Sequence, residues 1–538
     1  YEARVDATSA NNPVIGWMLD AMVDGSNHGS ALGTDANEIG LLATGTGQTH
    51  VGKMMQNNTL SSSYFSELSA GDIIGVALDL DNQALYISLE GTFIDSGDPT
   101  SGASKTGDVS QSAILANRVY IPCISSQDSN SSVSLNFGQN GTFNGQETAG
   151  GNADANGYGN FINSCPSGYL SLCSANLSEL TVGPNSTTNC NEHFNTVLYT
   201  ANNQTAQSIT GVGFQSDWLW FKQRSRSDSH ALYNTVMGID KSMRITTDTE
   251  FDNSDSETGV TAIGADGFTL GTDNQAWVNY GSDTMVAWLW KAGGDIADVT
   301  GNFIKDGVAF TPTQGTIDAN AISVNTTANF SIVEFTSDIS SDVGESGTPP
   351  TIAHGIGVKP TFVIVKDRDG GSYPHWNVWH QGYQPDTTYL NYNFIGLQNN
   401  AAANNAGWHR TDTGFTTNLF TPPRYQYNET GKSYICYVFA EVEGYSKFGK
   451  YVGNSSTDGT YVYTGFRPAL VCIKLASASG EDWIVWDNKR DVDNVAHNKF
   501  YWNANNAEIT DTTNRMVDFL SNGFKHRADH VSTNTGGT

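Results

Sequence analysis

Three stretches of the chain share one pattern of apolar and polar positions. Each begins with a glycine and a short turn, continues as an apolar run and ends at a lysine, with the same glycine-to-lysine interval in all three. They span residues 213–222, 357–366 and 465–474, and the last two also carry a proline in register. A continuous apolar run bounded by turn signals is typical of a buried strand. We therefore predict three equivalent buried strands.

The similarity continues beyond these strands, which indicates a repeated domain. An aromatic alternation follows at 482–487 and 375–380, with a weaker version at Leu232 and Tyr233, and period-2 spacing predicts a strand with one buried face. A Gly-Phe pair then occurs at residues 267–268, 414–415 and 523–524. Closing apolar strands are expected at 286–290 and 435–440.

The third copy contains no counterpart of the closing strand. Without it, one strand edge and an apolar groove would lie open, and natural proteins generally cover such edges. We expect that the chain continues past Thr538 with an apolar, aromatic strand resembling 434–440. The alternative is that another subunit donates a strand by augmentation.

The first 160 residues contain a different set of strands. Residues 71–88 form two alternating segments around an Asp-Asn turn, which predicts a β-hairpin, and further strands are expected at 119–124 and 132–138. This order resembles a SPRY domain, a concanavalin-like β-sandwich. The resemblance implies early strands at 1–5 and 15–18, with a further strand upstream of Tyr1.

Residues 168–177 resemble the segment that follows SPRY modules in uncharacterised tail and appendage proteins of phages, especially marine ones. Residues 322–335 together with 354–360 resemble the repeat in those proteins.

The predicted fold is all-β, with tandem antiparallel β-sandwich modules: a SPRY-like jelly-roll sandwich and three repeats. The predicted divisions are the SPRY-like sandwich 1–160, a connector 161–193, the first repeat 194–295, a linker 296–320, the second repeat 321–446 and the third repeat 447–538.

Composition narrows the function classes. The 538 residues are 15% charged and 11% aromatic, and Gly, Asn, Thr and Ser are abundant, which suits short strands joined by polar turns. The net charge of −28 would repel a phosphate backbone or an anionic membrane, so nucleic-acid binding is not expected. No apolar run approaches the roughly 20 residues that span a bilayer, so membrane insertion is not expected either.

Six cysteines leave two alternatives open. Cys123, Cys436 and Cys472 lie in apolar strands and are expected to be reduced. Cys165 and its neighbours Cys173 and Cys190 cluster in the connector, where they could form a disulfide or remain free. Paired short spacings and a fourth ligand for zinc are missing.

No motif predicts catalysis, a cofactor or a metal site. The sequence has no Gly-x-Ser-x-Gly elbow, His-Glu-x-x-His or phosphate-binding loop. His375 and His380 would lie on opposite faces of a strand, as solvent-facing or loop residues. The segment 79–82 could chelate Ca²⁺, but a short Asx turn is the favoured interpretation.

Aromatic residues are the remaining candidates for ligand contact. Trp218, Trp220, Trp288 and Trp290 lie on apolar strands, where they are expected to fill the space between the two sheets of a sandwich. Loop aromatics surrounded by polar residues are better candidates for recognition of a glycan or receptor. These are Trp408, Tyr425, Tyr427, Tyr501 and Trp502.

Together these features predict a non-enzymatic virion protein of a phage: a tail fibre, head fibre or surface decoration, exposed on the particle. Its expected partners are other virion proteins, further copies of itself in an oligomer, and a host surface glycan or protein receptor, with avidity from repetition. The alternative is a set of accessory carbohydrate-binding modules of a secreted bacterial protein or glycan-degrading enzyme.

Overall fold

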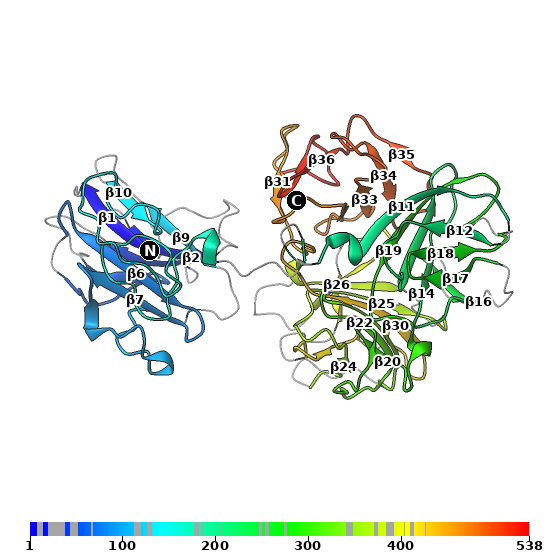
Figure 1. The fold of residues 1–538 in the computed structure, drawn as a ribbon, viewed down its shortest axis with the longest axis horizontal. Coiled ribbons are helices and arrows are strands. Elements are labelled where there is room, and N and C mark those ends of the chain that lie inside the picture. Colours follow the sequence, from blue (N-terminus) through cyan, green and yellow to red (C-terminus); the bar gives the residue numbers. More distant parts are fainter. Residues whose placement is uncertain are drawn as a thin grey trace. The chain divides into compact units, whose positions relative to one another are not determined.

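The computed structural model describes most of the chain. The described residues are 1–7, 14–19, 38–42, 52–65, 68–111, 114, 120–125, 132–176, 182–183, 186, 188–204, 206–246, 250–252, 258–273, 277–340, 348–370, 375–383, 392–402, 404–408, 414–424 and 427–536. They form two compact units, residues 1–178 and 179–538 (Figure 1). Within them the fold is built almost entirely of antiparallel strands, which confirms the all-β prediction. No helix in this part of the chain is long and apolar enough to cross a membrane.

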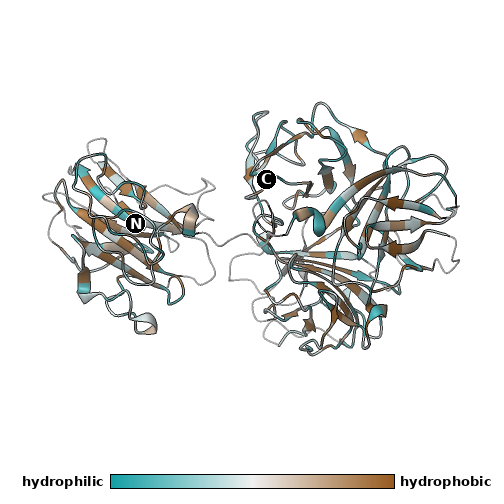
Figure 2. Ribbon diagram, viewed as in Figure 1, coloured by the Kyte–Doolittle hydropathy of each residue, from teal (hydrophilic) through white to brown (hydrophobic). Residues whose placement is uncertain are grey.

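Helical structure in the described residues is limited to single 3-10 turns. They are η2 (Ile94–Ser96), η3 (Gly102–Ser104), η4 (Ser174–Asn176), η5 (Cys190–Glu192), η6 (Ile296–Asp298) and η7 (Gln381–Tyr383). Figure 2 shows that apolar residues concentrate on the strands and polar residues on the connections between them. This distribution follows from the composition, because the polar residues favour turns.

The first unit is a sandwich of two five-stranded sheets. One sheet has the order β10 (Ser132–Asn136), β1 (Glu2–Ala7), β6 (Ile73–Asp79), β7 (Ala84–Leu89) and β8 (Thr92–Phe93). The other has the order β5 (Thr59–Leu60), β4 (Met54–Gln56), β3 (Glu38–Leu42), β2 (Val14–Leu19) and β9 (Tyr120–Ser125). Side chains such as Val5, Ile39 and Leu85 fill the space between the sheets. The hairpin predicted at 71–88 is confirmed as β6 paired with β7.

The second unit contains a main sheet and a small sheet in each of its three repeats. In the first repeat the main sheet is β11 (Phe194–Thr200), β19 (Thr284–Trp290), β13 (Trp218–Gln223), β14 (Ala231–Asn234), β15 (Lys241–Arg244) and β16 (Phe251–Asp252). Its small sheet is β12 (Gln207–Thr210), β18 (Gly267–Leu270) and β17 (Val260–Gly264).

The other two repeats follow the same plan. The main sheet of the second is β21 (Val308–Ala309), β20 (Phe303–Lys305), β22 (Ala319–Asn325), β23 (Phe330–Thr336), β30 (Ser433–Phe439), β25 (Phe362–Asp367), β26 (Trp376–His380), β27 (Tyr392–Gly396) and β28 (Asn404–Trp408), and its small sheet is β24 (Ile352–Ala353) and β29 (Leu419–Phe420). The third has β32 (Leu470–Ile473), β33 (Ile484–Asp487), β34 (Asn498–Tyr501) and β35 (Ile509–Thr510), with the small sheet β31 (Tyr461–Tyr463), β37 (Gly523–His526) and β36 (Val517–Leu520).

The three strands predicted to be equivalent begin at the same position of the repeat. Trp218, Phe362 and Leu470 each lie four residues before the shared lysine, and each opens a strand that pairs antiparallel with the next strand of the chain. Their partners across the hairpin are Asn234, His380 and Asp487.

Close backbone packing explains the glycine of the Gly-Phe pair in two repeats. A Cβ on Gly267 would lie 1.9 Å from the carbonyl oxygen of Ile209, and one on Gly523 would lie 2.1 Å from that of Val462. Both oxygens belong to the neighbouring strand of the small sheet. Only glycine fits such an approach of two strands.

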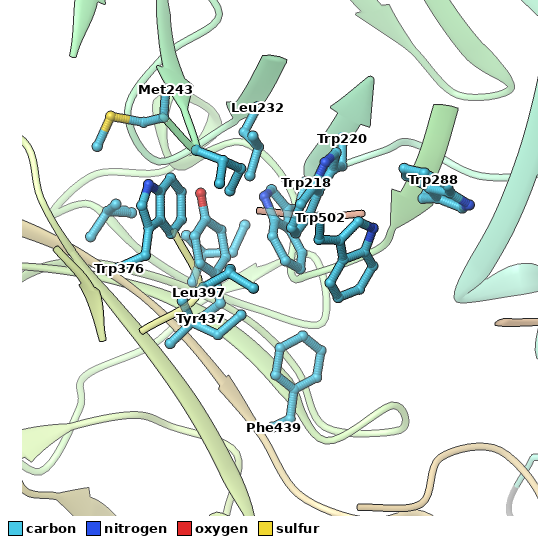
Figure 3. Packing of buried hydrophobic residues seen from close by; sticks show 14 of the residues in the cluster. Trp218, Trp220, Leu232, Met243, Trp288, Trp376, Leu397, Tyr437, Phe439 and Trp502 are labelled. Atoms are coloured by element: carbon cyan, nitrogen blue, oxygen red, sulfur yellow. The ribbon is translucent and has the colours of Figure 1, made fainter. Parts of the chain in front are cut away.

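One hydrophobic core joins all three repeats, and we call it the shared core. It is formed by the faces of the main sheets that point away from their own small sheets, and its largest members are Trp218, Trp220, Trp288, Trp376, Tyr437, Trp483 and Trp502. The ring of Tyr437 stacks on Trp218 with 4.1 Å between centroids, and Figure 3 shows it between Trp218 and Trp376. Three of the tryptophans predicted to lie between the sheets of one sandwich, Trp218, Trp220 and Trp288, therefore lie between repeats.

The structure also corrects the prediction that the strands at 375–380 and 482–487 have a single buried face. All of Ile484–Asp487 and four of the five residues Trp376–His380 are buried, so these strands do not have a single buried face. One face packs on the small sheet and the other on the shared core. A strand covered on both sides needs apolar residues at successive positions.

Three equivalent hydrogen bonds link the repeats in a closed ring. The indole Nε1 of Trp376 donates to the carbonyl oxygen of Arg244 at 3.0 Å, and that of Trp483 donates to Gly396 at 2.9 Å. In the first repeat His230 holds the same position, and its Nε2 lies 3.1 Å from the carbonyl oxygen of Tyr501. Each repeat thus donates to a main-sheet strand of another repeat. The accepting strands are β15 in the first repeat, β27 in the second and β34 in the third, as expected for a pseudo-threefold arrangement.

Candidate binding cleft

The clearest concave site in the described residues is a cleft of about 610 Å³ on the first unit. It lies on the outer face of the sheet that contains β6 and β7, under the segment 161–172. This size is within the range of small-molecule sites. The sequence predicted no site here, because the lining comes from segments far apart in the chain.

Tyr169 holds the covering segment against the sheet. Its ring packs on a small apolar cluster of Ala77, Ala84 and Tyr86, and its hydroxyl donates to the carbonyl oxygen of Pro99 at 3.2 Å. Burial raises the pKa of the Tyr169 hydroxyl, so this group remains a neutral donor. The cleft remains open beside this contact.

Asp154 fixes the turn from which the covering segment departs. Its two oxygens accept hydrogen bonds from the backbone of Asn156 and Tyr158 and from the backbone and hydroxyl of Ser171. Burial opposes ionisation, but these bonds and one from Asn176 outweigh it and hold the pKa of Asp154 well below its usual range. The carboxylate therefore stays charged and the segment stays anchored.

The rim of the cleft combines apolar and acidic groups. Leu80, Leu170 and Leu172 are exposed, with half of the Leu172 surface accessible. Asp79 and Asp81 lie among them. Apolar surface beside carboxylates suits a ligand with an apolar face and hydroxyl or cationic groups.

The lining of the cleft includes a cysteine thiol and an aspartate that closes a turn. Cys165 lines the cleft, but burial raises the pKa of its thiol, so the reactive thiolate is disfavoured. Asp79 accepts from the backbone and the side-chain amide of Asn82, which confirms the Asx turn. Among the described residues no three metal-ligating side chains gather at one point. All six cysteines are free, which decides between the two alternatives for the connector.

The structure places the predicted ligand-contacting aromatics in different environments. Trp408 is 1% exposed at the end of β28, and its Nε1 donates to the carbonyl oxygen of Thr421. Trp502 is in the shared core, 4.4 Å from the ring of Trp220. Trp408 and Trp502 are thus core residues, although the sequence suggested exposed loops.

The tyrosines are closer to the surface. Tyr427 is half-buried against Phe394, and Tyr501 is half-buried with its ring near Lys499. Tyr425 lies outside the described residues. The four described aromatics do not converge on one site, and their contact with a ligand stays a prediction.

His380 also differs from its prediction as a solvent-facing or loop residue. It ends β26, half-buried beside the rings of Phe362 and Phe448, and burial lowers its pKa to about 4. It is therefore neutral at pH 7. Its place at the end of the hairpin matches Asn234 and Asp487 in the other repeats.

A comparison with curated proteins finds no match to the chain. Residues 189–538 match a family described as a domain of unknown function, DUF7483. The matched range covers the three repeats and most of the chain, and it begins just before β11, where the first repeat starts. The chain therefore belongs to the DUF7483 family.

Proposed function

We propose that the chain is a non-enzymatic structural and binding protein on the surface of a phage particle. The observation that carries the proposal is the shared core, because it joins three sandwiches into one body through buried aromatic contacts and a ring of hydrogen bonds. Such a body keeps its loops at fixed positions, which is what an attachment or decoration protein needs.

A second observation supports a binding role for the first unit. The cleft is lined by apolar and acidic groups, and its cysteine thiol is held neutral by burial. A glycan suits this lining, since sugars offer apolar ring faces for the leucines and hydroxyls for Asp79 and Asp81. Repetition of the chain on a particle would raise a weak affinity by avidity.

Localisation tests the proposal directly. Antibodies against the recombinant chain are applied to purified particles and to the particle-free culture supernatant of the same infected host. Regularly spaced label on particles is the expected result. Label confined to the supernatant would contradict the proposal and favour the accessory module of a secreted bacterial protein.

A glycan array tests the binding role separately. The chain and a Leu170→Asp variant are compared on host surface polysaccharides. We expect binding by the parent chain and at least tenfold weaker binding by the variant, because the exposed Leu170 lies on the rim. Equal binding by both proteins would exclude the cleft.

A further inference from the structure

The main sheet of the third repeat differs from the other two at one edge. In the first repeat β13 pairs with β14 on one side and β19 on the other, and in the second β25 pairs with β26 and β30. In the third, β32 pairs with β33, and no described strand pairs with its other edge. One strand position that is filled in the first two sheets is therefore open in the third.

Side-chain exposure agrees with an open edge. Val363 of β25 and Val471 of β32 hold equivalent positions, yet Val363 is 0% exposed and Val471 is 6% exposed. On the opposite face, Ile364 is fully buried whereas its counterpart Cys472 is half-buried. The edge thus offers unpaired backbone groups between two apolar faces, a combination that favours pairing with a further strand.

The two filled positions define the chemistry of the strand that fits. Both β19 and β30 are seven residues long and apolar on both faces. Trp288 and Tyr437 are equivalent in them, since they lie opposite Trp220 and Ile364. A strand at the third position would place its corresponding residue opposite Cys472.

The pseudo-threefold arrangement also predicts the contact that the residue opposite Cys472 would make. Trp288 donates its Nε1 to Asp487 of the third repeat at 3.0 Å, and Asn234 of the first repeat donates to the hydroxyl of Tyr437 at 3.0 Å. Both contacts join a closing strand to the end of a hairpin in another repeat. The remaining hairpin end is His380, so an aromatic residue opposite Cys472 would lie beside His380.

We propose that the free edge of β32 is a docking site for an antiparallel β-strand, an extended polypeptide segment of about seven residues with aliphatic and aromatic side chains on both faces. The segment completes the third main sheet and seals the shared core. Its affinity comes from backbone hydrogen bonds, and its register is fixed by the aromatic residue opposite Cys472. This inference is independent of the proposed function.

Disulfide exchange with a synthetic peptide tests the site and its register. The peptide copies Ser433–Phe439 with serine in place of Cys436, cysteine in place of Tyr437 and added terminal lysines, and its cysteine carries a thionitrobenzoate leaving group. Burial raises the pKa of the Cys472 thiol, so the exchange is run at alkaline pH, where the small thiolate fraction attacks the peptide sulfur, a protein–peptide disulfide forms and thionitrobenzoate leaves with the electron pair of the broken S–S bond. The Cys173 thiol, whose pKa is lowered by its hydrogen bond with the Ser171 hydroxyl, reacts with any activated peptide, so the expected result is labelling of Cys472 in addition to this background, read by peptide mapping.

Two matched controls make the result specific. In one peptide the activated cysteine is moved by one residue, to the position of Cys436, so that it points to the opposite face of the strand. In one protein Cys472 is replaced, Cys472→Ser. We expect at least tenfold slower labelling of Cys472 with the shifted peptide, equal labelling of Cys173 with both peptides, and no labelling at position 472 in the variant. Equal rates at Cys472 for the two peptides would overturn the proposal, because they indicate collision without strand pairing.

Non-covalent binding gives a second readout. A fluorescent copy of Ser433–Phe439, again with serine for Cys436, is titrated with the whole chain, and a version with alanine in place of Tyr437 serves as the control. We expect at least tenfold weaker binding of the alanine peptide and slower hydrogen exchange at residues 470–473 on binding of the parent peptide. Absence of binding would overturn the proposal. So would a doubled mass in solution with residues 470–473 already protected, since a second copy would then occupy the edge.

Discussion

The two units of the chain bury their sheets in different ways. In residues 1–178 the two sheets enclose one core, and the outer face of one sheet is only partly covered, which leaves the cleft. In residues 179–538 each main sheet packs on its small sheet and also on the shared core. A sandwich repeated three times can therefore bury a second set of sheet faces, whereas in the first unit part of such a face stays uncovered.

The largest expected effect comes from the shared core. Trp220→Ala removes a fully buried indole that contacts Trp502 and donates to His230, so the free energy of unfolding of residues 179–538 should fall by about 3 to 5 kcal/mol. Chemical denaturation, with the two units followed separately by hydrogen exchange, measures it. An equal loss of protection in residues 1–178 would contradict the separation of the two cores.

Acid should also distinguish the units. Burial lowers the pKa of His230 to about 3 and that of His354 to about 4, so both are neutral in the folded protein, whereas in the unfolded chain they bind a proton below about pH 6.5. Their contribution to stability is complete above that pH and is lost progressively as the pH falls to about 3 for His230 and about 4 for His354. At pH 5 the loss should be roughly 2 kcal/mol for each.

A His230→Gln variant provides the control for the acid effect. Its unfolding free energy should change less between pH 7 and pH 5 than that of the parent chain, because one titrating group is absent. The comparison uses this difference between pH values, so a lower absolute stability of the variant does not affect it. An unchanged difference would contradict the assignment of His230 as a buried neutral side chain.

Two valines at equivalent positions sharpen the contrast between closed and open edges. Val363→Ala removes two methyl groups from a strand paired on both sides and should cost about 2 kcal/mol, whereas Val471→Ala, at the open edge, should cost about 1 kcal/mol. Urea denaturation of the two variants measures the difference. A larger cost for Val471→Ala would mean that the edge is already covered.

The smallest effect is expected at the surface of the same repeat. Tyr463 is 65% exposed on β31, and Tyr463→Ser should change the unfolding free energy by no more than about 0.5 kcal/mol. A loss comparable to that of the valine variants would show that this ring is buried by another contact in solution.

The pattern of the sequence was sufficient to predict the strands and their repetition. Local properties carry this information, because a short apolar run rich in β-branched and aromatic residues between a glycine turn and a lysine favours a buried strand. The glycine of the Gly-Phe pair and the Asx turn at Asp79 were also visible in the sequence, since each meets a backbone requirement within a few residues. The predicted roles of Trp408, Tyr425, Tyr427, Tyr501 and Trp502 in ligand contact stay predictions.

The surfaces that the strands face depend on contacts between distant parts of the chain. A buried tryptophan has the same pattern in sequence whether it packs within a sandwich, as first expected for Trp288, or between repeats, as the structure places it. Likewise, Lys222 and Lys366 close their apolar runs but are fully buried, because neighbouring elements cover them. The cleft depends on segments about 90 residues apart, β6 and the stretch around Tyr169, and their approach is set by long-range packing. Periodicity specifies the element, whereas contacts between distant elements specify its environment.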